Sequence, residues 1–183
     1  MRKLKLQVQI TVDGFIGGPN GDLDWRIWDW DDKLKAFAFP LRDTSDTILL
    51  GRKMAQTFIP HFEETVNTLK PSNGDKALDE RYDYANRMVN MPKIVFSKTM
   101  KTFPGRNVSV ENGDLVAAIK NLKSKPGKDM IVYGGASFVS SFIQHGLIDE
   151  FNIFVNPVLI NKGLRIFDLL EHRQKLSLIS ATA

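Results

Sequence analysis

Two apolar runs in this chain end on glycine and continue into a short turn of small or basic residues. Residues 47–50 lead into Gly51, Arg52 and Lys53, and residues 130–133 lead into Gly134, Gly135, Ala136 and Ser137. A strand that ends on glycine and opens into a helix can bind an anion, because glycine allows close approach and the first helical N–H groups have no partner within the helix. Two such junctions, the first with two cations, predict a ligand that carries more than one phosphate.

Each junction also has a plain structural interpretation. Taken alone, Gly51-Arg52-Lys53 is more typical of a strand-to-helix turn with solvated cations, and Gly134-Gly135 of a tight turn. The glycine pair lacks the third spaced glycine of a Rossmann fingerprint and the Gly-Lys-Ser/Thr of a Walker loop. The hypothesis of a phosphate-bearing ligand therefore depends on both junctions together, with Ser97-Lys98 after a third predicted strand as further support.

Three tryptophans and three aspartates lie close together around the start of a predicted helix. They are Trp25, Trp28 and Trp30, and Asp29, Asp31 and Asp32. Indole rings stack on planar ligands but also fill hydrophobic cores, and core packing of at least two of them is the simpler interpretation. The aspartates are first of all capping residues, while Asp32 or a neighbour is a candidate to orient a substrate or relay a proton. Trp25 and Asp29 are the candidates for substrate binding.

The hydrophobic pattern predicts strands that alternate with helices. Strands are expected at residues 4–12, 47–50, 93–97, 107–110 and 130–133, and helices at about 32–41, 51–58, 78–89, 115–122 and 138–145. This alternation predicts an α/β domain over residues 1–183, with helices on both faces of a mostly parallel sheet, in three α/β/α layers. Two late strands, at residues 151–160 and 176–181, have no helix between them and predict an antiparallel C-terminal edge.

The bulk composition excludes several classes of function. The 183 residues carry a net charge of +4 at pH 7, and the 25 lysines and arginines are spread along the chain, which argues against nucleic-acid binding. There are no cysteines, and the 3 histidines show no ligand spacing, so neither disulfides nor a metal site is expected. No segment resembles a signal peptide or a membrane span. We therefore expect a cytoplasmic protein that binds a small anionic molecule.

Several segments, in this order and over nearly the whole chain, resemble the dihydrofolate reductase superfamily. Within it, the sequence is most similar to the C-terminal reductase domain of the bacterial riboflavin-biosynthesis deaminase-reductase. The segments are residues 11–17 (TVDGFIG), 50–53 (LGRK), 92–98 (PKIVFSK), 132–135 (VYGG), 146–150 (GLIDE) and 157–163 (PVLINKG). None is specific by itself, and the last two favour the riboflavin-type reductases over true dihydrofolate reductases.

The resemblance implies a dihydrofolate reductase-like fold and an NADPH-dependent reductase, similar to 5-amino-6-(5-phosphoribosylamino)uracil reductase. Such an enzyme transfers hydride to a small planar heterocyclic or imine-like substrate. The resemblance also implies a homodimer. Positive charge on Arg52, Lys53 and Lys98 independently favours NADPH over NADH, because it would balance the 2′-phosphate.

The same resemblance assigns the cofactor contacts. The helix after Gly51 would face the phosphates, and Ser97 and Lys98 would hold the 2′-phosphate. The Gly134–Gly135 peptide bond is usually cis in such proteins, and the helix that follows, with Ala136 and Ser137, would meet the pyrophosphate. Ile16 would pack near the nicotinamide, while Asp13 would either support that end or fold the Asp13-Gly14 turn.

Two departures from the pattern leave alternatives open. Met54 stands where many related proteins place a threonine, so one phosphate contact is missing. Similar proteins usually continue into one more strand past the position of Ala183, so either the sheet edge differs or the sequence is part of a longer one. The alternative functions are a true dihydrofolate reductase, with one aspartate in a pterin pocket, and a non-catalytic NADPH-binding or ligand-sensing module.

Overall fold

The computed structural model describes residues 1–27, 30–69, 71 and 75–182, and most elements lie where the pattern predicts them. In chain order they are β1 (Leu4–Thr11), α1 (Asp32–Asp43), β2 (Ser45–Gly51), α2 (Arg52–Thr68), α3 (Lys76–Asn90), β3 (Lys93–Phe96), β4 (Val108–Glu111), α4 (Leu115–Ser124), β5 (Asp129–Tyr133), α5 (Ala136–Gln144) and β6 (Glu150–Asn156). Helix α2 is longer than expected and continues past Pro60 to Thr68. Phe58, Ile59 and Phe62 pack into the core on both sides of the proline, which keeps the helix continuous.

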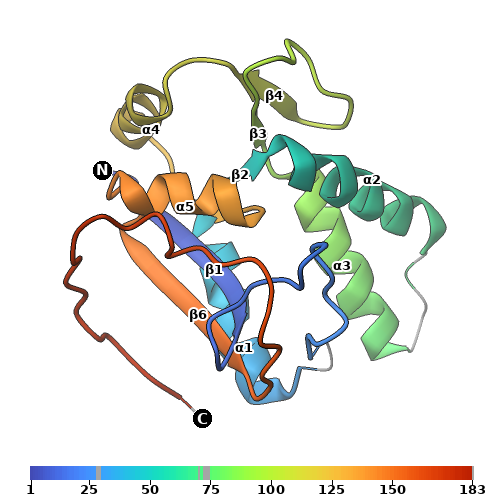
Figure 1. The fold of residues 1–183 in the computed structure, drawn as a ribbon. Helices are drawn as coiled ribbons and strands as arrows, with labels where there is room; N and C mark the ends of the chain where they lie inside the picture. The colour runs from blue at the N-terminus through green and yellow to red at the C-terminus, as the bar shows by residue number, and fades with distance from the viewer. Residues whose placement is uncertain (28–29, 70, 72–74, 183) are drawn as a thin grey trace.

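The strands form a sheet in the order β4-β3-β2-β5-β1-β6, and each neighbouring pair in it is parallel (Figure 1). The chain steps outward from β2 to β3 and β4, then returns through α4 to insert β5 between β2 and β1. Ligands in open α/β sheets bind beyond the carboxyl ends of the strands, where the strand order reverses. The reversal at β2, β5 and β1 therefore marks the place to look for a site.

The predicted antiparallel edge is wrong. Strand β6 pairs with β1 in parallel, from Lys5 opposite Glu150 to Thr11 opposite Asn156. The physical reason is the connection: α5 carries the chain back along the sheet before β6 begins, and a helical crossover returns a strand in the same direction. Residues 176–181, expected as a second late strand, form no regular structure, and their side chains are exposed.

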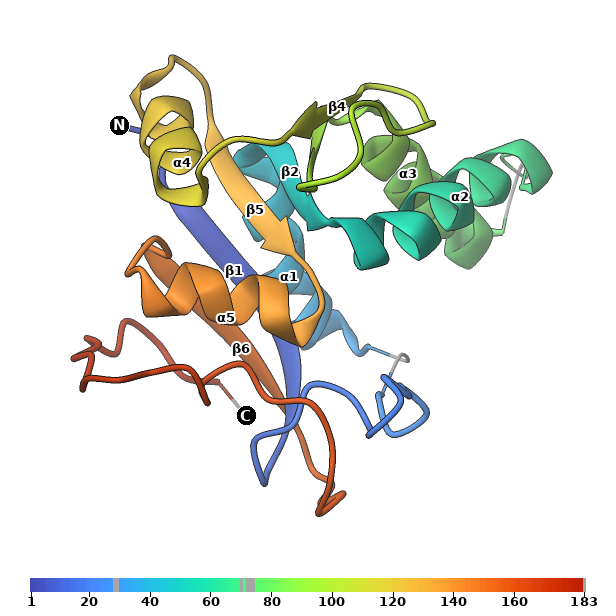
Figure 2. The ribbon, with the colours of Figure 1, turned by 45° about the horizontal axis from the view of Figure 1, so that its top comes forward.

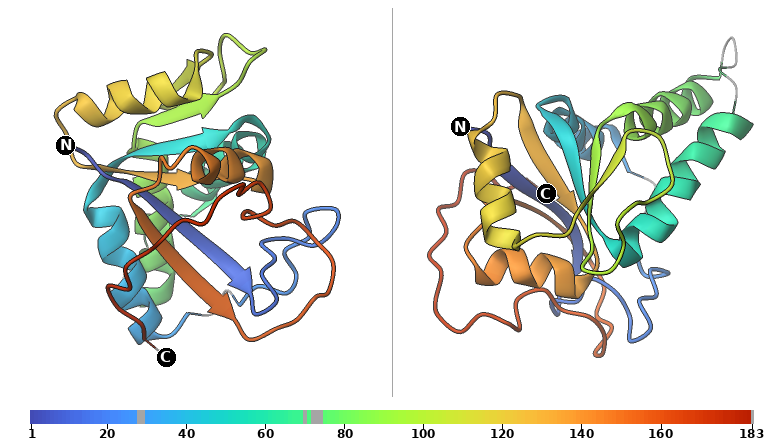
Figure 3. Two further views of the ribbon diagram at one scale, coloured as in Figure 1. Left: turned by 60° about the vertical axis from the view of Figure 1, so that its left-hand side comes forward. Right: turned by 90° about the horizontal axis from the view of Figure 1, so that it is seen from above.

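Helices cover both faces of the sheet, as predicted. Helices α4 and α5 lie over one face, while α1, α2 and α3 lie over the other (Figures 2 and 3). The alternation along β1 follows from this arrangement, because successive side chains of a strand point to opposite faces. Leu6, Val8 and Ile10 join the core under α4 and α5. The intervening Gln7 and Gln9 consequently point to the face that carries α2 and α3.

Candidate functional site

The two glycine junctions lie side by side at one edge of the sheet. Strands β2 and β5 are parallel neighbours, with Leu50 opposite Tyr133, so Gly51 and Gly134 follow at the same level. Strand β3 is the other neighbour of β2, with Gly51 opposite Phe96, which brings Ser97 to the same edge. The tertiary structure thus brings together the three segments that the sequence marked for phosphate binding.

The helices that start at these junctions lack side-chain caps. In α1, α3 and α4, the N-cap aspartates Asp31, Asp75 and Asp114 accept hydrogen bonds from first-turn N–H groups. Helices α2 and α5 instead begin at Gly51 and Gly135, and no side chain caps either of them. Their first N–H groups therefore remain available to an external acceptor, and the helix dipole favours an anionic one.

The glycines at these junctions have different roles. A Cβ on Gly134 would lie 2.7 Å from Phe138 Cδ1, and one on Gly51 would lie 3.0 Å from Phe138 Cβ. Both are therefore needed for close packing of the strand ends against α5. A Cβ on Gly135 would have no heavy atom within 4 Å, so the space over the start of α5 is open.

The expected cis peptide bond between Gly134 and Gly135 is wrong. No cis bond occurs among the described residues. Gly135 has φ −68° and ψ 164°, an ordinary extended conformation for an N-cap residue. A trans bond thus suffices for the turn into α5, and trans is the form of lower free energy.

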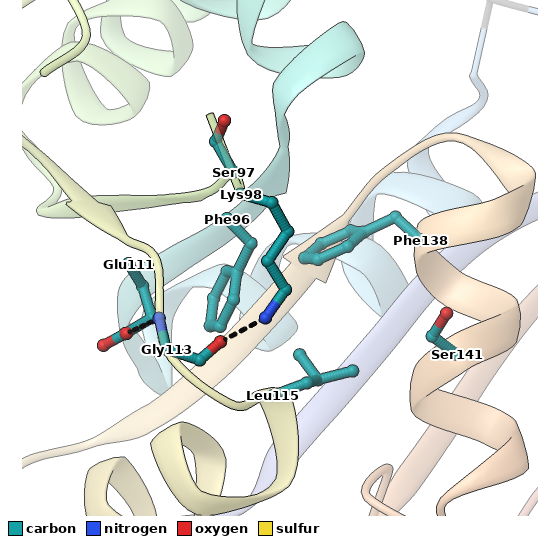
Figure 4. Close-up of a pocket in the computed structure, with 8 residues that line it drawn as sticks. All are labelled: Phe96, Ser97, Lys98, Glu111, Gly113, Leu115, Phe138 and Ser141. Carbon is teal, nitrogen blue, oxygen red and sulfur yellow. Dashed lines mark hydrogen bonds between the residues drawn. The ribbon is translucent and has the colours of Figure 1, made fainter. Parts of the chain in front are cut away.

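The cationic side chains at this edge point to solvent or to a small cleft. Arg52, Lys53 and Lys98 are exposed. A cleft of about 190 Å³ lies beside Lys98, whose amino group donates a 2.8 Å hydrogen bond to the Gly113 carbonyl (Figure 4). Phe96 and Phe138 line it, with ring centroids 5.5 Å apart. The cleft therefore combines an aromatic wall with the Lys98 ammonium and with the Glu111 carboxylate, which accepts a 2.7 Å hydrogen bond from the Gly113 N–H.

Ser97 has a structural contact at the same place. Its hydroxyl oxygen accepts hydrogen bonds from the backbone N–H groups of Thr99, at 3.3 Å, and Met100, at 3.1 Å. In Figure 4 the Ser97 hydroxyl points away from the Lys98 amino group. The Ser97 side chain thus shapes the turn after β3, and both Ser97 and Lys98 line the cleft.

A larger cavity, of about 680 Å³, lies on the α2–α3 side of the sheet near the β5 junction. The residues that line it are Gln7, Val8, Gln9, Ile16, Leu23, Arg26, Trp30, Met54, Thr57, Phe58, His61, Phe62, Thr65, Arg81, Tyr84, Ala85, Tyr133 and Gly134. Ile16, Met54 and Gly134 belong to segments that the sequence assigned to the cofactor. The cavity therefore adjoins the glycine junctions and is large enough for a small aromatic ligand.

The tryptophans and aspartates predicted near the substrate differ in whether they line this cavity. Trp30 lines the cavity, whereas Trp25 does not, and the Trp25 ring Nε1 donates to the Asp22 carbonyl at 3.2 Å. Asp32 is exposed in the first turn of α1, next to the N-cap Asp31, and does not line the cavity. Asp29 lies outside the described residues. No aspartate or glutamate is present among the described residues that line the cavity.

Several polar residues of the cavity were missed at the sequence level. Gln7 and Gln9 come from β1, Tyr133 comes from β5, and Arg26 follows the first loop. The sequence did contain a signal for Gln7 and Gln9: polar residues stand at every second position of a strand that is covered on both faces. Arg26 donates a 3.1 Å hydrogen bond to the Ile16 carbonyl, and its burial lowers the guanidinium pKa.

Asp13 holds the loop that positions Ile16. Its carboxylate accepts hydrogen bonds from the Thr11 hydroxyl at 2.6 Å and from the Asn161 N–H at 2.8 Å. These bonds, the Thr11 bond foremost, lower the pKa of Asp13. The backbones of Ile16 and Gly17 are also hydrogen-bonded to Leu164, at 2.8 Å in each direction. Of the two roles predicted for Asp13, the structure thus shows the folding of its turn. Asp13 also holds this turn to Asn161, a residue distant in the sequence.

Neither a membrane-spanning helix nor a cluster of metal ligands occurs in the described part of the chain. Within it, no helix has the length and apolar character that crossing a bilayer requires. No group of three acidic or histidine side chains converges there as metal ligands would.

Comparison with known proteins identifies relatives over the full length of the chain. The chain is 32% identical to the uncharacterized protein YyaP of Bacillus subtilis strain 168 over 179 residues, which is 98% of this chain and 87% of YyaP.

Two solved structures share its fold. One is a Thermotoga maritima diaminohydroxyphosphoribosylaminopyrimidine deaminase/5-amino-6-(5-phosphoribosylamino)uracil reductase, with a TM-score of 0.60 and 22% identity, over 100% of this chain and 51% of that one. The other is the dihydrofolate reductase of Enterococcus faecalis complexed with NADP(H), with a TM-score of 0.55 and 15% identity, over 91% of this chain and 78% of that one.

The predicted dihydrofolate reductase-like α/β fold is confirmed by these structures. The family model described as the RibD C-terminal domain matches residues 2–183. The chain therefore belongs to the RibD C-terminal domain family.

Proposed function

We propose that this protein is an NADPH-dependent reductase that transfers hydride to a small planar heterocyclic or imine-like substrate. The observation that carries the proposal is the pair of neighbouring helix starts at Gly51 and Gly135, neither of which has a side-chain cap. Two helix N-termini beside each other at a strand-order reversal suit a ligand with several phosphate groups.

The cofactor contacts follow from these positions. The first N–H groups of α2 and α5 would hold the pyrophosphate, with Gly134, Gly135, Ala136 and Ser137 at the second junction. Arg52, Lys53 and Lys98 would provide the positive charge for the 2′-phosphate. The open space above Gly135 fits such a group, because nothing in the described structure fills it. When bound, NADPH would supply the hydride, and Ile16 would pack beside the nicotinamide.

The 680 Å³ cavity is the proposed substrate pocket, because it adjoins Ile16 and Gly134 and is rich in aromatic side chains. Trp30 and Phe58 line it and suit a planar ring. This geometry favours Trp30 over Trp25 for substrate stacking and gives Asp32 no direct contact with the pocket. The named reductase of Thermotoga maritima and the dihydrofolate reductase complexed with NADP(H) support the reaction class. The homodimer implied by the resemblance belongs to the same proposal.

The proposal is tested by thermal shift with NADPH and NADH in parallel. NADPH at a ~100-fold excess over Kd is expected to raise the Tm of the wild type by about 5 °C, with a smaller rise for NADH. Arg52→Ala/Lys98→Ala should lose most of the NADPH shift, because both changes remove positive charge near the phosphates. Arg173→Ala/Lys175→Ala makes the same charge change on the exposed C-terminal segment and should keep the full shift.

Two outcomes would count against parts of the proposal. No shift with either nucleotide in the wild type would overturn the cofactor assignment. An NADPH shift in all variants would retain the cofactor but remove Arg52 and Lys98 from its site. A parallel assay with dihydrofolate and NADPH tests the rival reductase, and activity in that assay would make a pterin the substrate.

A further inference from the structure

A row of neutral polar side chains crosses the sheet at the floor of the 680 Å³ cavity. It runs from Tyr133 of β5 through Gln7 and Gln9 of β1 to Asn156 of β6, and all except Asn156 line the cavity. The Tyr133 hydroxyl donates a 2.7 Å hydrogen bond to Gln7 Oε1. Asn156 Nδ2 donates to Gln9 Oε1 at 3.2 Å. The amide oxygen of each glutamine thus accepts a hydrogen bond from a side chain of a neighbouring strand.

The remaining half of each amide is available to a ligand. Gln7 Nε2 and Gln9 Nε2 have no hydrogen-bond partner among the described residues, although both residues line the cavity. Among the described residues, the fully buried side-chain nitrogen and oxygen atoms that lack a hydrogen-bond partner all belong to arginines. The two glutamine nitrogens are therefore not fully buried. The floor therefore presents two N–H donor groups, whose orientation is set by their oxygen contacts.

The Tyr133 side chain is itself held firmly. Its ring stacks on Phe58, with centroids 5.7 Å apart and an interplanar angle of 26°. Burial raises the pKa of Tyr133 well above its usual range, so the hydroxyl remains protonated and continues to donate to Gln7. Tyr133 consequently acts on a ligand through Gln7, as a positioning residue.

We propose that Gln7, oriented by Tyr133, makes the cavity select planar rings that present carbonyl oxygens over rings that present amino groups. The inference rests on the proposed function for the identification of this cavity as the substrate pocket. An amide N–H donates and therefore pairs with a carbonyl, whereas a carboxylate accepts and would pair with ring amino groups. A ring without the matching acceptor leaves the amide desolvated and unpaired, which lowers affinity.

The test compares two rings of equal size, pteridine-2,4-dione and 2,4-diaminopteridine, at pH 7.5. Binding is followed by quenching of tryptophan fluorescence, to which Trp30 in the cavity wall contributes. The wild type is expected to bind the dione at least about tenfold more tightly than the diamine, and Gln7→Met should reduce that ratio by about tenfold. Tyr133→Phe removes only the hydroxyl and should reduce the ratio severalfold, with no further loss in the double variant.

Gln144→Met is the matched control, because it makes the same substitution at an exposed residue at the end of α5 that does not line the cavity. It should leave the ratio unchanged. An unchanged ratio in Gln7→Met would overturn the proposal, as would the absence of a dione preference in the wild type. The NADPH thermal shift is measured on every variant. The absence of an NADPH shift in the wild type would contradict the reductase assignment. A normal NADPH shift together with an unchanged ring preference in Gln7→Met would contradict only the role of Gln7.

Discussion

Gly135→Leu is expected to weaken NADPH binding on the order of 100-fold while the fold stays intact. Gly135 has an extended backbone that any residue adopts, and its Cβ position is free of contacts within 4 Å. A leucine side chain would therefore be accommodated, but it would occupy the space over the first N–H groups of α5. Losing about two charge-assisted hydrogen bonds to phosphate costs about 3 kcal/mol, which corresponds to the predicted change in Kd.

The measurement is the Kd for NADPH by calorimetry, together with the Tm of the free protein. Gly135→Ala adds one methyl group and should give an intermediate Kd. Ala77→Leu is the control, because it makes a similar increase in size at an exposed residue in the first turn of α3. If Gly135→Leu binds NADPH as the wild type does, the pyrophosphate cannot lie on the N-terminus of α5.

Lys93→Met is expected to lower the free energy of unfolding by about 3 kcal/mol. Lys93 begins β3 and is only 2% exposed. Its ammonium group donates to the carbonyls of Met88 at 3.0 Å, Val89 at 2.7 Å and Met91 at 2.8 Å, at the end of α3. Methionine fills a similar volume but leaves these carbonyl groups without that donor, and a buried unpaired polar group costs ~1–3 kcal/mol.

Urea denaturation at pH 7 gives the free energy, with Lys120→Met on the exposed face of α4 as the control for loss of a lysine charge. A change below about 0.5 kcal/mol in Lys93→Met would mean that other groups satisfy the end of α3.

The same lysine predicts a pH dependence. Burial lowers the pKa of Lys93 to about 8 from its ordinary value of 10.5. Between these values the unfolded state binds the proton and the folded state does not, so the free energy of unfolding rises with pH. The difference between wild type and Lys93→Met should therefore grow by about 1 kcal/mol per pH unit from pH 8 to 10.5, and stay constant below pH 8. If the difference in the free energy of unfolding instead stays constant from pH 8 to 10.5, the three carbonyls keep the Lys93 ammonium charged.

Local sequence signals predicted most of the elements correctly, because they depend on neighbouring residues alone. Asp31, one of the aspartates expected to cap a helix, caps α1. The short apolar run at residues 130–133 is a buried strand, and the glycines after residues 50 and 133 end strands and open into helices. Capping and strand propensity act over a few residues, so a single sequence contains the information needed for them.

The cavity depended on contacts that no local pattern encodes. Gln7 and Tyr133 are 126 positions apart in the chain, yet they meet because β5 inserts beside β1. The direction of β6 was mispredicted for the same reason, since it depends on the crossover through α5 rather than on the residues of the strand. Asp32 was chosen for its chemistry, but the placement of α1 directs it to solvent.

The sequence by itself thus determined the class of fold, the glycine junctions and the cations around them. Those features follow from backbone conformation and charge, which residue types set directly. The tertiary structure decided which side chains share a cavity, namely Gln7, Tyr133 and Trp30 rather than Trp25 and Asp32. Strand order and helix placement result from the burial of apolar surface over the whole chain, and a ligand pocket is made of whatever residues that packing leaves facing one another.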